Sequence, residues 1–176
     1  KLRIRWEYLL GIIKIGLPAG LQSMVFSLSN VVIQAAINSF GSDGIAGSTA
    51  EQNFEFMAYF VINAFAQTAT TFTSQNFAAQ DKERCKKIYR LCTFIGLASC
   101  LGLSLIFLIG RHLFIQIFST DENVIHYAMI RMWSVCLLEL LTGVYEISGG
   151  CLRGMGHSMT PAVITVLGTC VFRLVW

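Results

Sequence analysis

Charged side chains are scarce in this sequence. Asp, Glu, Lys and Arg make up 13% of the 176 residues, whereas soluble domains carry about 25%. Apolar residues reach 55%, and the mean hydropathy is +0.62. The formal net charge is only +3, which is too little to indicate a nucleic-acid partner. The composition therefore excludes a typical soluble domain and predicts an integral membrane protein.

Paired cysteines and clustered histidines are also missing. The six cysteines stand in apolar runs or beside a basic segment, with no C-x-x-C spacing, and the three histidines are scattered singly. These patterns argue against a disulfide framework and against a metal site. A membrane-embedded transferase would need His, Asp or Lys gathered at one interface, and the sequence shows no such group. We therefore expect neither a bound metal nor an enzyme.

Long apolar runs, by contrast, are abundant. About 20 apolar residues are enough to cross a bilayer as a helix. Runs of this kind lie at residues 15–40, 52–79, 91–110, 130–152 and, cut short, 160–176. Residues 1–14 alternate basic and apolar side chains and are predicted to form an interfacial helix, with Pro18 in the first turn of the span that follows. Residues 41–50 are predicted to form a loop. The predicted fold is an all-α membrane bundle of about four full transmembrane helices and one partial helix.

The two ends of the sequence suggest an excerpt. The first residue is not Met, and the last residues lie inside an apolar run. We expect the sequence to be part of a longer protein.

Basic residues are unevenly distributed along the chain. Ten of the 13 lie in residues 1–14, in the segment 80–90 or at Arg153. Short loops rich in Lys and Arg are retained on the cytoplasmic side. We therefore predict a multi-pass protein of the plasma or inner membrane with a cytoplasmic N-terminal segment. This rule alone explains the segment 80–90 (QDKERCKKIYR), and contact with phosphate or a lipid headgroup is the alternative.

The stretch 132–154 carries two acids, Glu139 and Glu146, inside an apolar run. At about 100° per residue along a helix, both lie in one narrow sector with Thr142. Carboxylates are costly at the centre of a membrane and persist where they face a cavity or a partner. We predict an ion or substrate site on this face. In the alternative reading, Glu146 pairs with a basic residue from a missing part of the protein, or Glu139 reaches water near the cytoplasmic half.

A polar stripe on the first predicted span faces one side of the helix. Its members are Ser23, Ser27, Asn30, Gln34 and Asn38. Such residues commonly form hydrogen bonds between helices in membranes. Five of them in one stripe favour one wall of a polar pathway, and Asn30 and Gln34 join the candidate site.

The second predicted span has Glu51 and Glu55 near its start. A face of mostly small residues follows, at Ala58, Ile62, Ala66, Ala69 and Thr73. Small residues let helices approach closely. We interpret Glu51 as a residue that favours a helix N-terminus. Glu55, one turn deeper, is the better candidate for function.

Several phrases resemble one family. IGLPAGLQ, SQNFAAQDKERCKK, LFIQIFSTDENVI and GGCLRGMGHSMTP are similar, in order and spacing, to the second half of the multidrug and toxic compound extrusion (MATE) transporters. The resemblance covers nearly the whole chain. It implies the C-terminal lobe of a twelve-helix exporter of two six-helix lobes, with the N-terminal lobe as a missing partner. Members export cationic or amphipathic drugs in exchange for Na⁺ or H⁺, and no cofactor other than this coupling ion is implied.

The acids of this chain depart from the family pattern. Many members have a glutamate about eight residues after the Pro of this first span, where Phe26 stands here. The acid expected 11 residues before the Arg of L-R-G falls on Thr142, which Glu139 and Glu146 flank. The acid in the next span of the drug/proton exchangers falls within about one residue of Glu55. The departures bear on the identity of the coupling ion rather than on the fold.

The resulting hypothesis places ion and substrate binding at Glu139, Glu146, Glu55, Thr142, Asn30 and Gln34. Loading and release of a proton at the acids is one mechanism, and coordination of Na⁺ by their oxygens is the other. An alternative is that the protein is a flippase for lipid-linked saccharides, from the same superfamily, which would require a cationic groove. A structural membrane fragment that is inactive alone is another. The excerpt by itself is expected to transport nothing, because the pathway needs both lobes.

Overall fold

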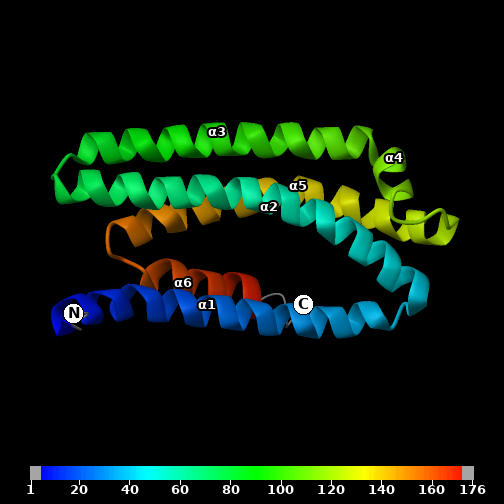
Figure 1. The fold of residues 1–176 in the computed structure, drawn as a ribbon, viewed down its shortest axis with the longest axis horizontal. Helices are drawn as coiled ribbons and strands as arrows, with labels where there is room; N and C mark the ends of the chain where they lie inside the picture. Colours follow the sequence, from blue (N-terminus) through cyan, green and yellow to red (C-terminus); the bar gives the residue numbers. More distant parts are fainter. Residues whose placement is uncertain (1–4, 172–176) are drawn as a thin grey trace, which may run out of the picture.

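The computed structural model of this chain describes residues 5–171, except for the side chains at 136, 137 and 169–171. Within these residues the chain is helical throughout and has no strand, so the predicted all-α class is confirmed. The helices, labelled in Figure 1, are α1 (Trp6–Asn38), α2 (Gly41–Ala78), α3 (Lys82–Ile109), α4 (Arg111–Gln116), α5 (Glu122–Gly154) and α6 (Met159–Thr165), followed by a π-helical segment, η1 (Val166–Val171).

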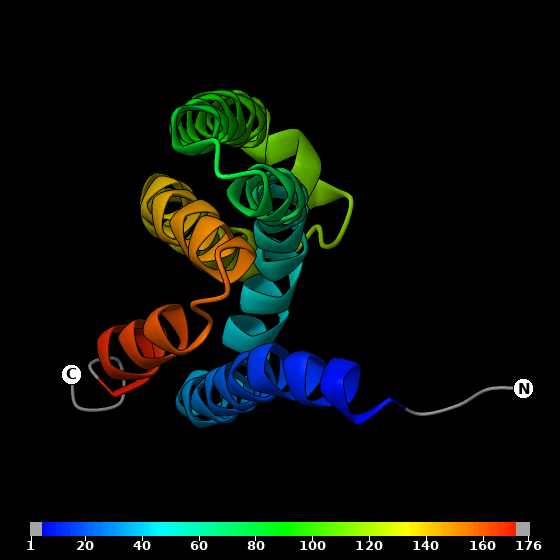
Figure 2. The ribbon, with the colours of Figure 1, turned by 90° about the vertical axis from the view of Figure 1, so that its left-hand side faces the viewer.

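The long helices form two groups. Figure 1 shows α2, α3 and α5 in one group, while α1 and α6 lie together below them. Figure 2, at 90° to this view, shows α1 and α6 on the far side of α2 and α5 from α3. The start of α1, the α2–α3 turn and the α5–α6 turn all lie at one end of the molecule (Figure 1). The basic segments are therefore gathered at that end.

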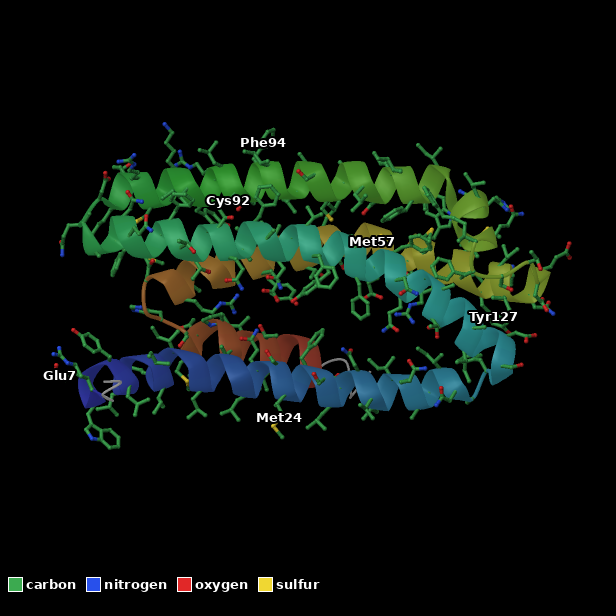
Figure 3. All side chains as sticks on the ribbon, in the orientation of Figure 1. Glu7, Met24, Met57, Cys92, Phe94 and Tyr127 are labelled. Atoms are coloured by element: carbon green, nitrogen blue, oxygen red, sulfur yellow. The ribbon has the colours of Figure 1, made fainter. Side chains whose placement is uncertain are left out.

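The apolar core lies between α2, α3 and α5. One cluster contains Phe54, Phe107, Ile115, Ala128 and Met132. Two others contain Ala66, Ala69, Cys92, Ile147 and Cys151, and Ala58, Ile62 and Cys100. The small-residue face predicted for the second span is thus the packing face of α2. In Figure 3, Cys92 points from α3 toward α2, whereas Phe94 and Met24 point outward.

Two described helices, α1 and α3, are long and apolar enough to cross a membrane. α5 makes a third if its halves, which meet at 46°, are counted as one span. The sequence predicted about four full spans and one partial one. α2 does not reach the same hydropathy, because Gln, Asn, Thr and Ser recur along its second half.

Residues 41–50, predicted as a loop, are the first turns of α2. Their glycines are needed for packing rather than for a turn. A Cβ at Gly47 would lie 2.6 Å from the backbone oxygen of Val124 at the start of α5. Close contact with α5 therefore outweighs the weak helix propensity of this Gly- and Ser-containing segment.

Pro18 was expected in the first turn of a helix, but it lies well inside α1, which begins at Trp6 and includes residues 6–14 of the predicted interfacial segment. Proline lacks an N–H, so the carbonyl of Lys14, four residues earlier, loses its helical donor. The hydroxyl of Ser158, in the α5–α6 turn, donates to this carbonyl at 3.2 Å. A contact between distant segments thus replaces the hydrogen bond that the helix cannot form.

Candidate functional site

A cavity of about 710 Å³ separates α1 from α2 and α5, and α6 contributes Thr165 to its wall. All six residues of the predicted site line it: Asn30, Gln34, Glu55, Glu139, Thr142 and Glu146. The polar stripe of α1 and the acid-bearing face of α5 therefore face the same space. What binds there stays a prediction.

Glu139 is the most enclosed of the predicted residues. Its exposed fraction is 6%, and its Oε1 atom has no hydrogen-bond partner among the described residues. The carboxylates of Glu55 and Glu146 both act on it electrostatically. Burying a carboxylate without a partner is costly. Glu139 is therefore placed to receive a proton or a cation from the cavity.

The acids of α2 are held by one arginine of α5. The Nε atom of Arg131 lies 2.6 Å from Oε2 of Glu51, and its Nη2 atom lies 2.9 Å from Oε2 of Glu55. The same guanidinium donates to the hydroxyl of Ser48. Glu51 is only 1% exposed, which is tolerated because the charge is paired.

The sequence interpretation placed Glu51 near a helix N-terminus, but the structure does not. Glu51 lies well inside α2 because that helix begins at Gly41.

Glu146 has its own cation on the same helix. The Nη2 atom of Arg153 lies 3.4 Å from Oε2 of Glu146. Glu146 thus pairs with a basic residue of this chain, whereas the alternative reading expected a basic residue from a missing part of the protein. Arg153 also lines a second cavity of about 510 Å³, and Gln22, Ser23, Tyr59 and Glu146 line both cavities. The two spaces adjoin along α1.

The α1 wall is held by polar contacts. Nε2 of Gln22 donates to Oγ1 of Thr165 at 3.0 Å, which ties α1 to α6. Nε2 of Gln34 donates to Oδ1 of Asn38 at 3.2 Å, within the stripe. Four members of the stripe, Ser23, Ser27, Asn30 and Gln34, line the cavity. The hydrogen bonds of Ser23 and Gln34 stay within α1, and the role of the stripe in a polar pathway stays a prediction.

Sequence reasoning missed Arg131 and Glu51 as members of this site. Arg131 lies at the start of the predicted span 130–152 and was not considered as a site residue. A signal was available, because Arg131, Val135, Leu138 and Thr142 follow a helical repeat and all line the cavity. Glu51 and Glu55 likewise share a face at a spacing of four residues.

A family model described as MatE matches residues 18–176. The chain belongs to the MatE family. Its curated relatives include "Probable multidrug resistance protein NorM" of Thermotoga maritima, 21% identical over 170 residues, or 97% of this chain and 37% of that protein. "Probable multidrug resistance protein YoeA" of Bacillus subtilis is 22% identical over 94% of this chain and 36% of its own length. "Multidrug export protein MepA" of Staphylococcus aureus is 24% identical over 92% of this chain and 36% of its own length.

This MatE chain thus spans a little over a third of the length of these relatives. Membership confirms the family that the four sequence phrases predicted. It also confirms a protein of a membrane transporter family rather than an enzyme family.

Proposed function

We propose that this chain forms one side of the pathway of a cation-coupled exporter for cationic or amphipathic small molecules. Three relatives are named as multidrug resistance or export proteins, and the helices of this chain enclose a polar cavity at the position of the predicted site. The observation that carries the proposal is the buried Oε1 atom of Glu139, which lines that cavity and has no hydrogen-bond partner among the described residues.

The charge balance of the cavity favours a positively charged ligand. Arg131 pairs with Glu51 and Glu55, and Arg153 pairs with Glu146. The cavity itself is lined by three acids, Glu55, Glu139 and Glu146, and one arginine, Arg131. Glu139 is the acid without a cation among the described residues. A cavity with excess negative charge and low-dielectric walls attracts cations.

Coupling follows from competition for Glu139. When a proton or Na⁺ occupies the carboxylate, the negative charge is cancelled and a cationic substrate is released. When the coupling ion leaves, the charge returns and favours substrate binding. Thr142, Asn30 and Gln34 supply oxygens that would serve Na⁺, a hard cation that prefers oxygen ligands. The proton needs only the carboxylate.

The test replaces Glu139 with Gln in the full-length protein and measures efflux of a lipophilic cation from cells or proteoliposomes. A proton gradient and a Na⁺ gradient are imposed separately, so that the coupling ion is identified. We expect Glu139→Gln to reduce coupled export at least tenfold. Glu122→Gln, on the exposed first turn of the same helix, is the matched control and should export normally. Normal export by Glu139→Gln would overturn the proposal.

The flippase alternative has less support from the cavity. A lipid-linked saccharide carries phosphate, and the two arginines of this site are already paired with carboxylates. Binding of a lipophilic cation, compared with a polyprenyl-phosphate sugar, separates the two functions. Preferential binding of the phosphate sugar by the full-length protein would favour the flippase.

A further inference from the structure

The α2–α3 turn carries a groove that the transport site does not use. The groove has a volume of about 480 Å³ and lies between the last turns of α2 and the first turns of α3. Arg84 and Lys87 supply its charges, Gln75 and Asn76 its neutral polar lining, and Phe72, Ile88 and Leu91 its apolar lining. The same two basic residues also line a neighbouring hollow of about 690 Å³. Two cations one helical turn apart thus stand beside an apolar wall.

The charges of Arg84 and Lys87 are available. Asp81 accepts a hydrogen bond from the backbone N–H of Arg84, as the N-cap of α3, and not from its guanidinium. Glu83 is occupied by Lys86, whose Nζ lies 2.8 Å from Oε1. That hydrogen bond and the charge of Lys86 lower the pKa of Glu83, so this pair persists as ions. Within residues 5–171, neither Arg84 nor Lys87 takes part in an ion pair.

Polarity changes along the groove in one direction. Arg84 and Lys87 lie near the turn, whereas Phe72 and Leu91 lie farther along the helix pair and are 50% and 49% exposed. Phe94, one turn beyond Leu91, points outward and is 74% exposed (Figure 3). An anionic group followed by a hydrocarbon chain matches this order. A free phosphate would use only the first part.

The location fits the same ligand. The groove lies beside the α2–α3 turn. In Figure 1 this turn lies at the end of the molecule where the start of α1 and the α5–α6 turn also lie, the end that the basic residues predict to be cytoplasmic. Anionic lipids are concentrated in the cytoplasmic leaflet, and basic pockets between helices bind their headgroups. Guanidinium groups bind phosphate through two parallel hydrogen bonds.

We propose that Arg84 and Lys87 bind the phosphate of an anionic phospholipid, with one acyl chain lying along Phe72, Ile88 and Leu91. The positive-inside rule accounts for basic residues anywhere on this turn. It does not account for the placement of two of them at the mouth of an apolar groove. The site is independent of the transport cavity and does not rest on the function proposed for it.

Native mass spectrometry of the full-length protein, with dioleoyl phosphatidylglycerol or dioleoyl phosphatidylcholine added, tests this site. Arg84→Gln with Lys87→Gln should lower phosphatidylglycerol affinity about 20- to 30-fold, since each basic residue near the surface contributes about 1 kcal/mol. Binding of phosphatidylcholine should be weak and unchanged. Elution of the variant as a single folded species checks that it is intact.

The matched control removes the same charges nearby. Lys82→Gln with Arg90→Gln also eliminates one Lys and one Arg, but neither residue lines the groove. This variant should keep phosphatidylglycerol affinity within about threefold, as expected for residues outside a specific site. Equal losses in both double variants would show only a diffuse basic surface and would overturn the proposal. Equal binding of glycerol 1-phosphate, which has no acyl chain, would also overturn it.

Discussion

The α2–α5 interface and the α1 wall of the cavity use glycine in opposite ways. A Cβ at Gly150 or Gly154 of α5 would lie 2.5 Å from a backbone oxygen of α2, that of Ala66 or of Thr70. On α1, by contrast, a Cβ at Gly20 would meet no described atom within 4 Å. The backbones of α2 and α5 are therefore in contact, whereas α1 makes no such close backbone contact at Gly20.

Burial follows the same division. α2 buries side chains along most of its length, from Gly44 to Thr73, whereas α1 buries only Pro18 and Ser29. Oγ1 of Thr70 donates to the oxygen of Gly150 at 3.0 Å, which adds a polar contact to the close α2–α5 approach. α1 is joined to the other group mainly through α6 and the turn before it. The acids therefore lie on the closely packed helices α2 and α5, whereas the polar stripe lies on α1, which packs less closely against them.

The largest predicted effect comes from filling a glycine of the packed pair. Gly150→Leu forces α2 and α5 apart and should destabilise the full-length protein by more than about 3 kcal/mol, because the obstacle is backbone. Gly20→Leu, on the exposed side of α1, should change stability by less than about 0.5 kcal/mol. The half-unfolding temperature in detergent measures both. Similar shifts for the two variants would remove the contrast between the helix groups.

The next largest predicted effect is a difference in stability loss between variants of Arg131 and Arg153. Arg131→Met leaves Glu51 buried without its cation and should cost about 2 kcal/mol. This is less than the ~3–5 kcal/mol of a fully buried pair, because the Arg131 side chain is 23% exposed. Arg153→Met breaks a single contact of 3.4 Å facing the α1 side and should cost less than about 1 kcal/mol. Thermal unfolding of both variants gives the comparison.

A rescue experiment sharpens the interpretation of Arg131. Glu51→Gln removes the charge that Arg131→Met leaves unpaired, so the double variant should regain most of the lost stability. If Glu51→Gln lowers stability further in the Arg131→Met protein, the loss comes from packing of the arginine side chain and not from the unpaired carboxylate.

Sequence periodicity was sufficient to find the faces of the helices. The small residues from Ala58 to Thr73 predicted close packing of α2, and the spacing of Glu139, Thr142 and Glu146 predicted one acid-bearing face. These features depend only on the geometry of a single helix.

The ion pairs between helices could not be predicted from the periodicity of a single helix. Arg131 and Glu55 are 76 residues apart, and their contact depends on the register between α2 and α5. That register is set by Gly47, Gly150 and Gly154, where backbones meet. The position of Pro18 inside α1 was missed for a related reason, because the Lys14 carbonyl that Pro18 leaves without a donor accepts a hydrogen bond from Ser158 of a distant turn.

The smallest predicted effect tests how α1 is held. Ser158→Ala removes the donor to the Lys14 carbonyl and should cost about 1 kcal/mol. Pro18→Ala restores an N–H within α1 that can donate to the same carbonyl. In the Pro18→Ala protein, Ser158→Ala should therefore cost much less, and the difference between the two costs measures the coupling. Equal costs in both backgrounds would mean that Ser158 stabilises the α5–α6 turn alone and that α1 is held by other contacts.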